Sequence, residues 1–197
     1  MNRYLAFIYI AFVIMLVSGC GGEDNPNVID ADTLIDQGWI EYSAGSYQNA
    51  IYRHQSALEM DSEKSEAYNG IAWAETKLGK IDASIDNFKK AVLKSPNNAD
   101  AHAGLAGSYF TAGNYEQAIA SGKSVLSINP NYESPHDPIK ANNIRLLLAE
   151  SYYNIGDYNS AKAQIEMIGI YGKTIDASSP DFTLNLLLAI DDLAKKI

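Results

Sequence analysis

Apolar positions along the chain repeat with a period of 34 residues. The stretch that starts at Gly45 reads GSYQNAI, and similar stretches start at Gly79 and Gly113. A fourth copy starts at Gly156, one period plus nine residues further on. A fixed period of this size is typical of stacked structural repeats. We interpret each glycine as the turn between two helices, and the apolar residues behind it as the first buried face of the second helix.

The same pattern predicts the organisation of the chain. In the first unit, Leu34, Ile35 and Trp39 form an apolar stripe at helical spacing, which predicts a helix over 32–44. Near the end, Ser179-Pro180-Asp181 has the form of a helix start. The expected parts are repeat units at 31–64, 65–98, 99–132 and 142–170, an insertion at 133–141, and a capping helix at 179–196.

The capping helix should cover the open end of the last repeat. The side chains expected to face that repeat are those of Phe182, Leu186, Ile190 and Leu193. Leu184 and Leu188 fall on the flanks, where a cap is expected to be more polar. We expect them to gain extra burial against the fourth unit, and the alternative is a second contact surface.

The insertion contains one helix-start signal. Asp137-Pro138 has the form of an N-cap followed by a first-turn proline, so we expect the fourth helix pair to begin there. Residues 131–136 would then form a loop. Insertions between repeats lie on one face and are sometimes part of the binding face, and the alternative is a tolerated surface loop.

Several residues at set positions of the period resemble those of the tetratricopeptide repeat family. The third unit has Leu105-Ala106, Tyr109, Ala118 and Pro130 at the family's positions, and the fourth has Leu148-Ala149, Tyr152 and Ala161. The second unit departs from the family at Glu75, and the first at Gln37 and Glu41. The resemblance implies an all-α solenoid of about four helix-turn-helix repeats, whose first helices line a concave groove that binds peptides or proteins.

The first twenty residues have the three regions of a secretory signal peptide. A single Arg3 precedes an apolar run over 4–17, and Ser18, Gly19 and Cys20 follow. This end resembles a bacterial lipobox, which implies a signal peptide at 1–19 and a lipidated Cys20. We therefore expect a flexible tether at 20–30 and a lipid anchor on an envelope membrane, the outer membrane facing the periplasm. The alternatives are an ordinary signal peptide and an uncleaved anchor helix.

Composition and charge exclude several classes of function. The formal net charge is −9, and acidic residues are spread along the chain, which argues against nucleic acid as a partner. Known catalytic and metal-binding motifs are absent. Of the three histidines, His54 and His102 fall on positions that the repeat buries, so we expect packed neutral side chains, and His136 stands alone in the insertion. We predict no catalytic residue, no cofactor and no metal, and hence not an enzyme.

Two positions recur on the expected groove lining. The first holds Trp39, Trp73, Gly107 and Glu150, and the second holds Tyr42, Thr76, Phe110 and Tyr153. Mid-helix Gly70 and Gly104 suggest a close backbone approach that forms a low groove floor. The alternative is that the tryptophans fill these glycine positions and pack between repeats. Asn69 could correspond to one member of the family's carboxylate clamp, although its basic partners are missing. The predicted partner-binding residues are Trp39, Tyr42, Asn69, Gly70, Trp73, Gly104, Gly107, Phe110, Glu150 and Tyr153.

The charge of this lining predicts the chemistry of the partner. Acidic side chains such as Asp36 and Glu66 fall on or beside the lining, whereas Lys77 is almost the only base. We therefore expect an apolar to basic segment of another envelope protein, bound by a membrane-tethered scaffold. The alternative is a module that binds cell-wall glycan by stacking sugars on the same aromatic side chains.

Overall fold

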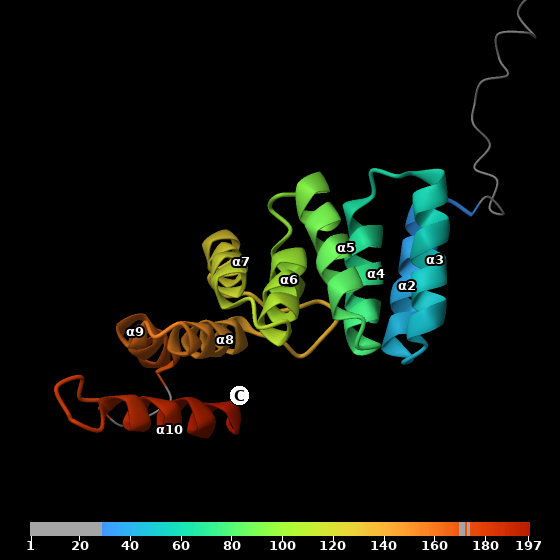
Figure 1. Ribbon diagram of the computed structural model, residues 1–197. Helices are drawn as coiled ribbons and strands as arrows, with labels where there is room; N and C mark the ends of the chain where they lie inside the picture. The colour runs from blue at the N-terminus through green and yellow to red at the C-terminus, as the bar shows by residue number, and fades with distance from the viewer. Residues whose placement is uncertain (1–28, 170–171, 173) are drawn as a thin grey trace, which may run out of the picture.

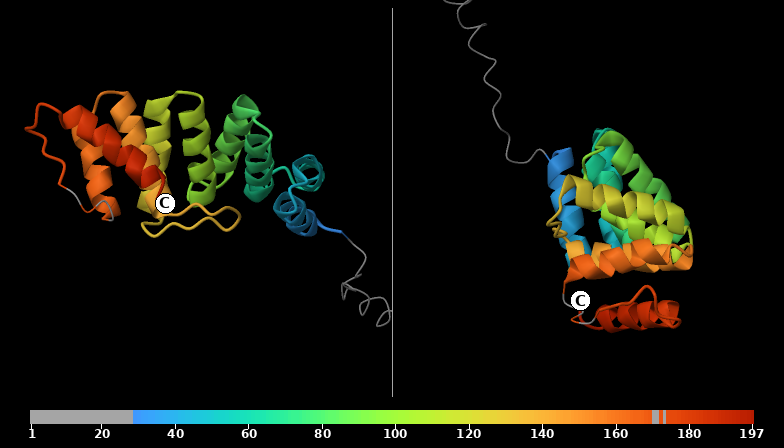
Figure 2. Two further views of the ribbon diagram at one scale, coloured as in Figure 1. Left: turned by 90° about the horizontal axis from the view of Figure 1, so that it is seen from below. Right: turned by 90° about the vertical axis from the view of Figure 1, so that its left-hand side faces the viewer.

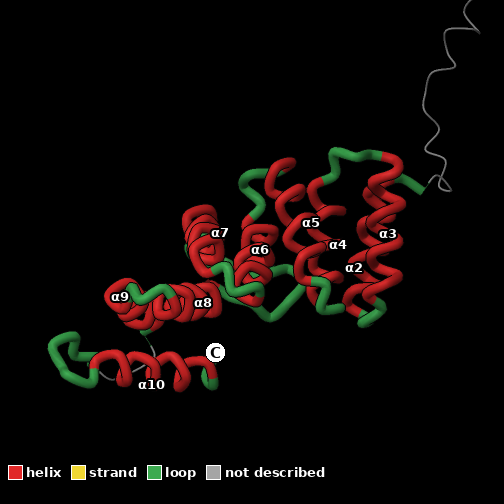
Figure 3. Tube along the Cα trace, in the orientation of Figure 1, coloured by secondary structure: helices red, strands yellow, loops and turns green. Residues whose placement is uncertain are grey.

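The computed structural model describes residues 29–169, 172 and 174–197, and in this part of the chain it contains nine helices and no strand (Figures 1 and 3). The prediction of an all-α helical-repeat solenoid is confirmed. The helices are α2 (Ala31–Ser43), α3 (Tyr47–Met60), α4 (Ser65–Lys77), α5 (Ile81–Lys94), α6 (Ala99–Thr111), α7 (Tyr115–Ile128), α8 (Ala141–Asn154), α9 (Tyr158–Ile168) and α10 (Phe182–Ala194).

The predicted signal peptide at 1–19 and the lipidated Cys20 lie outside the described residues. Among the helices that are described, none is both long enough and apolar enough to cross a membrane.

The recurring glycines form the turns within the helix pairs. Gly45, Gly79, Gly113 and Gly156 have φ angles of 76°, 73°, 76° and 83°. This left-handed region carries no steric penalty for glycine and disfavours residues with a Cβ atom. The backbone N–H of Gly113 donates to the carbonyl of Phe110 at 3.0 Å, which closes the end of α6. The 34-residue spacing of the first three glycines is therefore the spacing of tight helix–helix turns, and the insertion lengthens the last interval to 43 residues.

The first helices of the pairs form the inner side of the stack. Successive first helices contact each other, α2 with α4, α4 with α6 and α6 with α8, whereas successive second helices do not. The second helices therefore spread apart on the outer side (Figure 1). Any groove of this solenoid is lined by α2, α4, α6 and α8.

Two mid-helix glycines accept side chains from the preceding pair. A Cβ atom on Gly70 would lie 2.1 Å from His54 Nε2, and one on Gly104 would lie 2.0 Å from Phe88 Cζ. Both glycines are buried by these side chains, so they mark a close approach but do not form the expected low floor of a groove. The tryptophans do not fill this space, because His54 of α3 and Phe88 of α5 occupy it. Both side chains are completely buried and hold adjacent pairs together. The other part of the alternative agrees with the structure, since both tryptophans are buried between repeats and bond to the next unit.

The insertion does not begin a helix at Asp137. Helix α8 begins at Ala141 with Lys140 as its N-cap, so the predicted cap at Asp137 is wrong by three residues. Two backbone bonds fold the segment back on itself, from Ser134 N–H to the Ile139 carbonyl at 2.8 Å and from Ala141 N–H to the Tyr132 carbonyl at 2.7 Å. The carboxylate of Asp137 bonds to side chains of other helices instead of capping α8. We call residues 131–140 the crossing loop; it is the gold loop in the left view of Figure 2.

Helix α10 covers the end of the stack. It packs on α8 and α9 through Leu186, Ala189, Ile190 and Leu193, all buried, while Phe182 is partly buried. Leu184 and Leu188 are each 54% exposed, so the expected extra burial of these two side chains is wrong. Figure 1 shows α10 beside α8 and α9, at the end opposite α2.

Candidate interaction site

The crossing loop is held on the inner side of the solenoid by a buried carboxylate. Asp100 of α6 accepts hydrogen bonds from Asn69 Nδ2 at 2.9 Å and from Trp73 Nε1 at 2.8 Å, both on α4. Its other oxygen accepts from Tyr132 Oη at 2.6 Å and from Ser134 Oγ at 2.8 Å, both on the loop. Bonds to an ionised acceptor are stronger than neutral ones. Asp100 therefore joins α4, α6 and the loop.

Further along, the crossing loop covers the first predicted aromatic side chain. The ring of His136 stacks on the ring of Trp39, with centroids 3.4 Å apart and planes 7° from parallel. Trp39 Nε1 donates to Glu66 at 3.1 Å, and His136 Nε2 lies 3.6 Å from the same carboxylate oxygen. Trp39 is only 8% exposed as a result of these contacts and of its packing in the core.

The tip of the loop reaches the first helix of the stack. Tyr42 of α2 donates a hydrogen bond to one oxygen of Asp137, and Lys77 of α4 forms an ion pair with the other oxygen at 2.6 Å. Burial raises the pKa of Tyr42, and the bonded Asp137 carboxylate raises it further. Lys77, the base expected on the groove lining, is therefore already paired within the chain.

These contacts divide the ten predicted residues into two groups. Six are buried in the core or under the crossing loop, namely Trp39, Tyr42, Asn69, Gly70, Trp73 and Gly104. An open aromatic ladder along the whole groove is therefore not formed by the described residues. Stacking of a sugar on the Trp39 ring, as the glycan alternative allows, would need the crossing loop to move away, whereas Phe110 and Tyr153 remain partly exposed.

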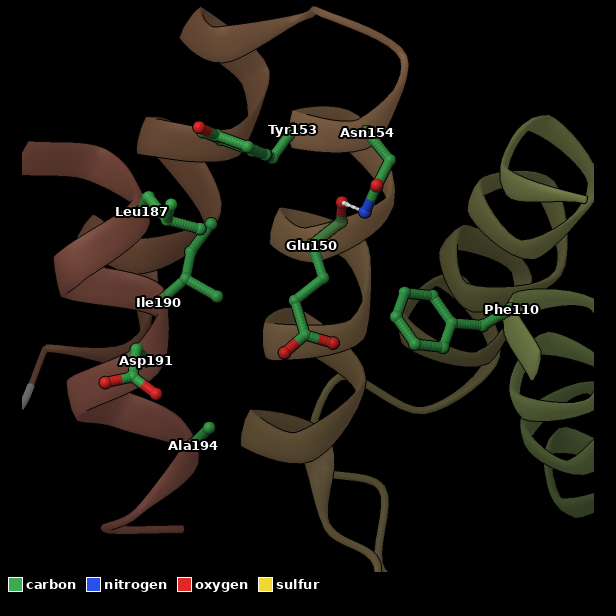
Figure 4. A pocket seen from close by; sticks show the side chains of 8 residues that line it. All are labelled: Phe110, Glu150, Tyr153, Asn154, Leu187, Ile190, Asp191 and Ala194. Carbon is green, nitrogen blue, oxygen red and sulfur yellow. Dashed lines mark hydrogen bonds between the residues drawn. The ribbon is translucent and has the colours of Figure 1, made fainter. Parts of the chain in front are cut away.

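The other predicted residues lie where the inner side is open. Phe110 of α6 with Glu150 and Tyr153 of α8 line a pocket of about 350 Å³ together with α10 (Figure 4). Gly107 is partly exposed on α6, and no atom outside its own stretch of helix lies within 4 Å of where its Cβ would be. The structure therefore brings Phe110, Glu150 and Tyr153 together at one pocket, which we call the α6/α8/α10 pocket.

Five of the eight residues that line this pocket were not predicted as site residues from the sequence. Its other lining residues are Asn154, Leu187, Ile190, Asp191 and Ala194. Four of these belong to α10, which occurs once and lies outside the 34-residue period, so the repeat pattern gives no signal for them. The only sequence signal was the surplus of apolar residues on the flanks of this helix.

The aromatic side chains of the pocket are held by neighbours on the second helices. The ring centroids of Phe110 and Tyr115 are 5.7 Å apart with planes at 65°, and those of Tyr153 and Tyr158 are 5.2 Å apart with planes at 59°. Both Phe110 and Tyr153 remain partly exposed. The two rings therefore have fixed positions while part of each stays open to a partner.

The pocket contains one carboxylate with an unusual environment. Glu150 is partly buried, and this burial raises the pKa of its carboxyl above the ordinary value. Within the part of the chain that the structure describes, no side chain donates a hydrogen bond to this carboxylate or forms an ion pair with it; the bond drawn in Figure 4 runs from Asn154 to the backbone carbonyl of Glu150. The second carboxylate, Asp191, pairs with Lys195 at 2.5 Å.

Comparison with known proteins agrees with this architecture. Residues 70–133 match the family model of the tetratricopeptide repeat. A search of curated proteins finds no match. The chain is similar in structure to YrrB, a TPR protein "with an unusual peptide-binding site", with a TM-score of 0.67, 19% identity and coverage of 85% of this chain and 93% of YrrB.

Two further crystal structures are similar. MamA matches with a TM-score of 0.59 and 20% identity over 87% of this chain and 83% of MamA. TTC0263, a TPR protein of Thermus thermophilus, matches with a TM-score of 0.56 and 20% identity over 84% of this chain and 82% of that protein. At these identities the likeness concerns the fold. Residues 70–133 are therefore similar to the tetratricopeptide repeat, and the described chain folds as a helical-repeat solenoid of the kind that these structures share.

Proposed function

We propose that this protein is a non-catalytic scaffold that binds a segment of another envelope protein on the inner side of its solenoid. The observation that carries the proposal is the α6/α8/α10 pocket, where Phe110, Glu150 and Tyr153 lie open on the inner side. Aromatic side chains in a partly desolvated concave site are common anchors of protein interfaces. The peptide-binding site named for YrrB supports a similar use of the fold here.

The anchor is the second part of the proposal. Residues 1–20 have the pattern of a lipoprotein signal peptide that ends at Cys20, the only cysteine of the chain. Two or more acyl chains on this residue would attach the protein firmly to a membrane, since each buried CH₂ contributes about 0.8 kcal/mol. We propose the outer membrane, facing the periplasm, as the location, with the segment before α2 as the tether.

The Cys20→Ser variant tests the anchor. We expect the wild-type protein to fractionate with membranes and to partition into the detergent phase, and the variant to remain in the aqueous phase. Circular dichroism should be identical for the two, because position 20 lies before the helical repeats. A variant that still fractionates with membranes would refute the lipid anchor.

A crosslinked pull-down from a bacterial envelope extract tests partner binding. The bait is the full-length chain, compared with a Phe110→Ala/Tyr153→Ala variant. The control, Tyr52→Ala/Leu93→Ala, removes side chains that are 63% and 77% exposed on the outer helices α3 and α5. We expect one protein to be captured by wild type and control and lost with the pocket variant, while circular dichroism stays unchanged. Equal capture by all three forms would refute this site.

A further inference from the structure

We propose that the α6/α8/α10 pocket binds the side chain of a lysine or arginine, flanked in the partner by an apolar residue. The inference rests on the proposed function and specifies the chemistry of the bound segment. It depends on three features of the pocket: an unpaired carboxylate, aromatic and aliphatic walls, and the lack of any basic lining residue.

The unpaired carboxylate is the first argument. Glu150 projects into the space between α6 and α10, as Figure 4 shows, and the described residues supply no cation or donor to it. Partial burial of a carboxylate without a partner has a free-energy cost, because water is removed and nothing replaces it. A guanidinium or ammonium group in the pocket would supply the missing hydrogen bonds.

The titration of Glu150 is consistent with this use. Burial raises the pKa of its carboxyl, and no neighbouring cation opposes the shift. The other groups that face the pocket are Asp191 on α10, which is paired with Lys195, and the phenol of Tyr153 on α8. A bound cation would favour the ionised form of Glu150 and lower its pKa, so binding of a basic side chain should release protons near that pKa.

The walls suit the rest of such a side chain. Phe110 lies on one side of Glu150, and Leu187 and Ile190 of α10 lie on the other (Figure 4). Lysine and arginine carry apolar stems that can pack on these surfaces while the charged group reaches the carboxylate. The exposed parts of the Phe110 and Tyr153 rings can also attract a cation through their faces. A volume of about 350 Å³ accommodates one long side chain and an apolar neighbour.

Charge also excludes the opposite kind of segment. None of the eight residues that line the pocket is basic, and two are acidic. Lys77, the base on the neighbouring inner surface, is already held by Asp137 of the crossing loop. An acidic segment would therefore meet repulsion here without compensation.

A selection of random heptapeptides displayed on phage tests the inference. The target is the full-length chain in a mild detergent, as wild type, as Glu150→Gln and as the matched control Glu116→Gln, which changes an exposed carboxylate on α7. We expect wild type and control to enrich peptides with one lysine or arginine next to an apolar residue. Glu150→Gln should keep the apolar preference and lose the basic one.

Calorimetry on one enriched peptide then measures how much the charge of its basic residue contributes to binding. Replacement of its basic residue by norleucine keeps the stem and removes the charge. We expect this to weaken binding to wild type roughly tenfold to a hundredfold, the range for a hydrogen bond to a charged group. The same replacement should change binding to Glu150→Gln by less than about threefold.

Each outcome decides the inference separately from the proposed function. Equal binding of the basic and norleucine peptides, enrichment of acidic peptides, or no enrichment would overturn the assignment of a basic side chain. The proposed function would still stand if the pull-down loses its partner with the Phe110/Tyr153 variant. If the selection succeeds and the pull-down shows no pocket-dependent partner, the pocket chemistry stands and the scaffold role fails.

Discussion

The buried imidazole of His54 should make the stability of the protein depend on pH. His54 is 0% exposed, and its ring lies against the backbones of Gly38 and Gly70. Neither ring nitrogen has a hydrogen-bond partner among the described residues. Burial lowers the pKa of His54 from 6.5 to about 4, although the nearby Glu66 carboxylate acts in the opposite direction.

The sign and size of the effect follow from this shift. Above pH 6.5 the imidazole is neutral in both the folded and the unfolded chain, and it causes no pH dependence. Between pH 6.5 and about 4 the unfolded chain binds a proton that the folded chain does not, so the free energy of unfolding falls as the pH falls. At 1.36 kcal/mol per pKa unit, the loss by pH 4 is on the order of 3 kcal/mol.

The chain itself suggests the substitution that removes this dependence. Phe88, one period after His54, places a phenyl ring against Gly104 in the same way that His54 lies against Gly70. In His54→Phe no group at this position titrates, and two unpartnered nitrogens are lost. Beside Phe88 the residue one period after Gly38 is Ala72, so the repeat already holds a phenyl ring next to a larger neighbour than Gly38. We therefore expect stability at pH 7 to rise by about 1 kcal/mol.

The pH dependence of the free energy of unfolding can be measured by urea denaturation at pH 7.0, 6.0, 5.5 and 5.0, with tryptophan fluorescence as the signal. Trp39 reports on the site, since its ring centroid is 5.2 Å from that of His54. The range ends at pH 5 so that carboxylate titration contributes little. Wild type and the control His102→Gln, which changes a partly exposed histidine, should lose stability across this range, and His54→Phe should not. An equally steep loss in His54→Phe would refute the reasoning.

Two further predictions concern packing and the crossing loop. Gly104→Ala should lower the free energy of unfolding by about 1–3 kcal/mol, because its Cβ would overlap Phe88. Gly107→Ala in the same helix should leave this free energy unchanged or raise it by up to about 1 kcal/mol. Urea denaturation compares the two variants, and equal effects would contradict the packing of Phe88 against Gly104. Asp100→Asn should lower the same free energy by about 2 kcal/mol or more, because an amide donor replaces an acceptor of four hydrogen bonds, and should speed limited proteolysis within 131–140. The exposed control Asp82→Asn should change neither quantity, and an Asp100→Asn loop that resists protease like wild type would contradict the role of this carboxylate.

The helical-repeat fold could be predicted from sequence because its signals are local. A glycine every 34 residues marks a turn with positive φ, and the apolar stripes beside it mark the buried faces of the helices. The close approach at Gly70 and Gly104 could be predicted for the same reason. The side chains that fill these positions could not, because His54 and Phe88 come from the preceding pair and only the stacking brings them there.

The candidate site was harder to predict because most of it depends on segments that do not repeat. The crossing loop occurs once, and its contacts with Tyr42 and Lys77 span 95 and 60 residues. No periodic pattern encodes such contacts, so Trp39 and Trp73 seemed available although both are buried. Asp137 preceding a proline resembled a helix cap, but its carboxylate bonds to Tyr42 and Lys77 instead. Phe110, Glu150 and Tyr153 were predicted from the same positions of the period. They remain partly exposed and line the α6/α8/α10 pocket.

The crossing loop also changes how this solenoid should respond to force. In a simple stack each repeat contacts only its neighbours, so the array can bend and extend elastically and can unfold from its ends. Here Asp137, which precedes the fourth helix pair, is bound to Tyr42 of the first pair and Lys77 of the second. The crossing loop therefore connects the first, second and fourth helix pairs across the inner side, and it resists any motion that moves these pairs apart. A pulling force applied between α2 and α10 should meet a stiff element that yields abruptly when the contacts of Asp137 break.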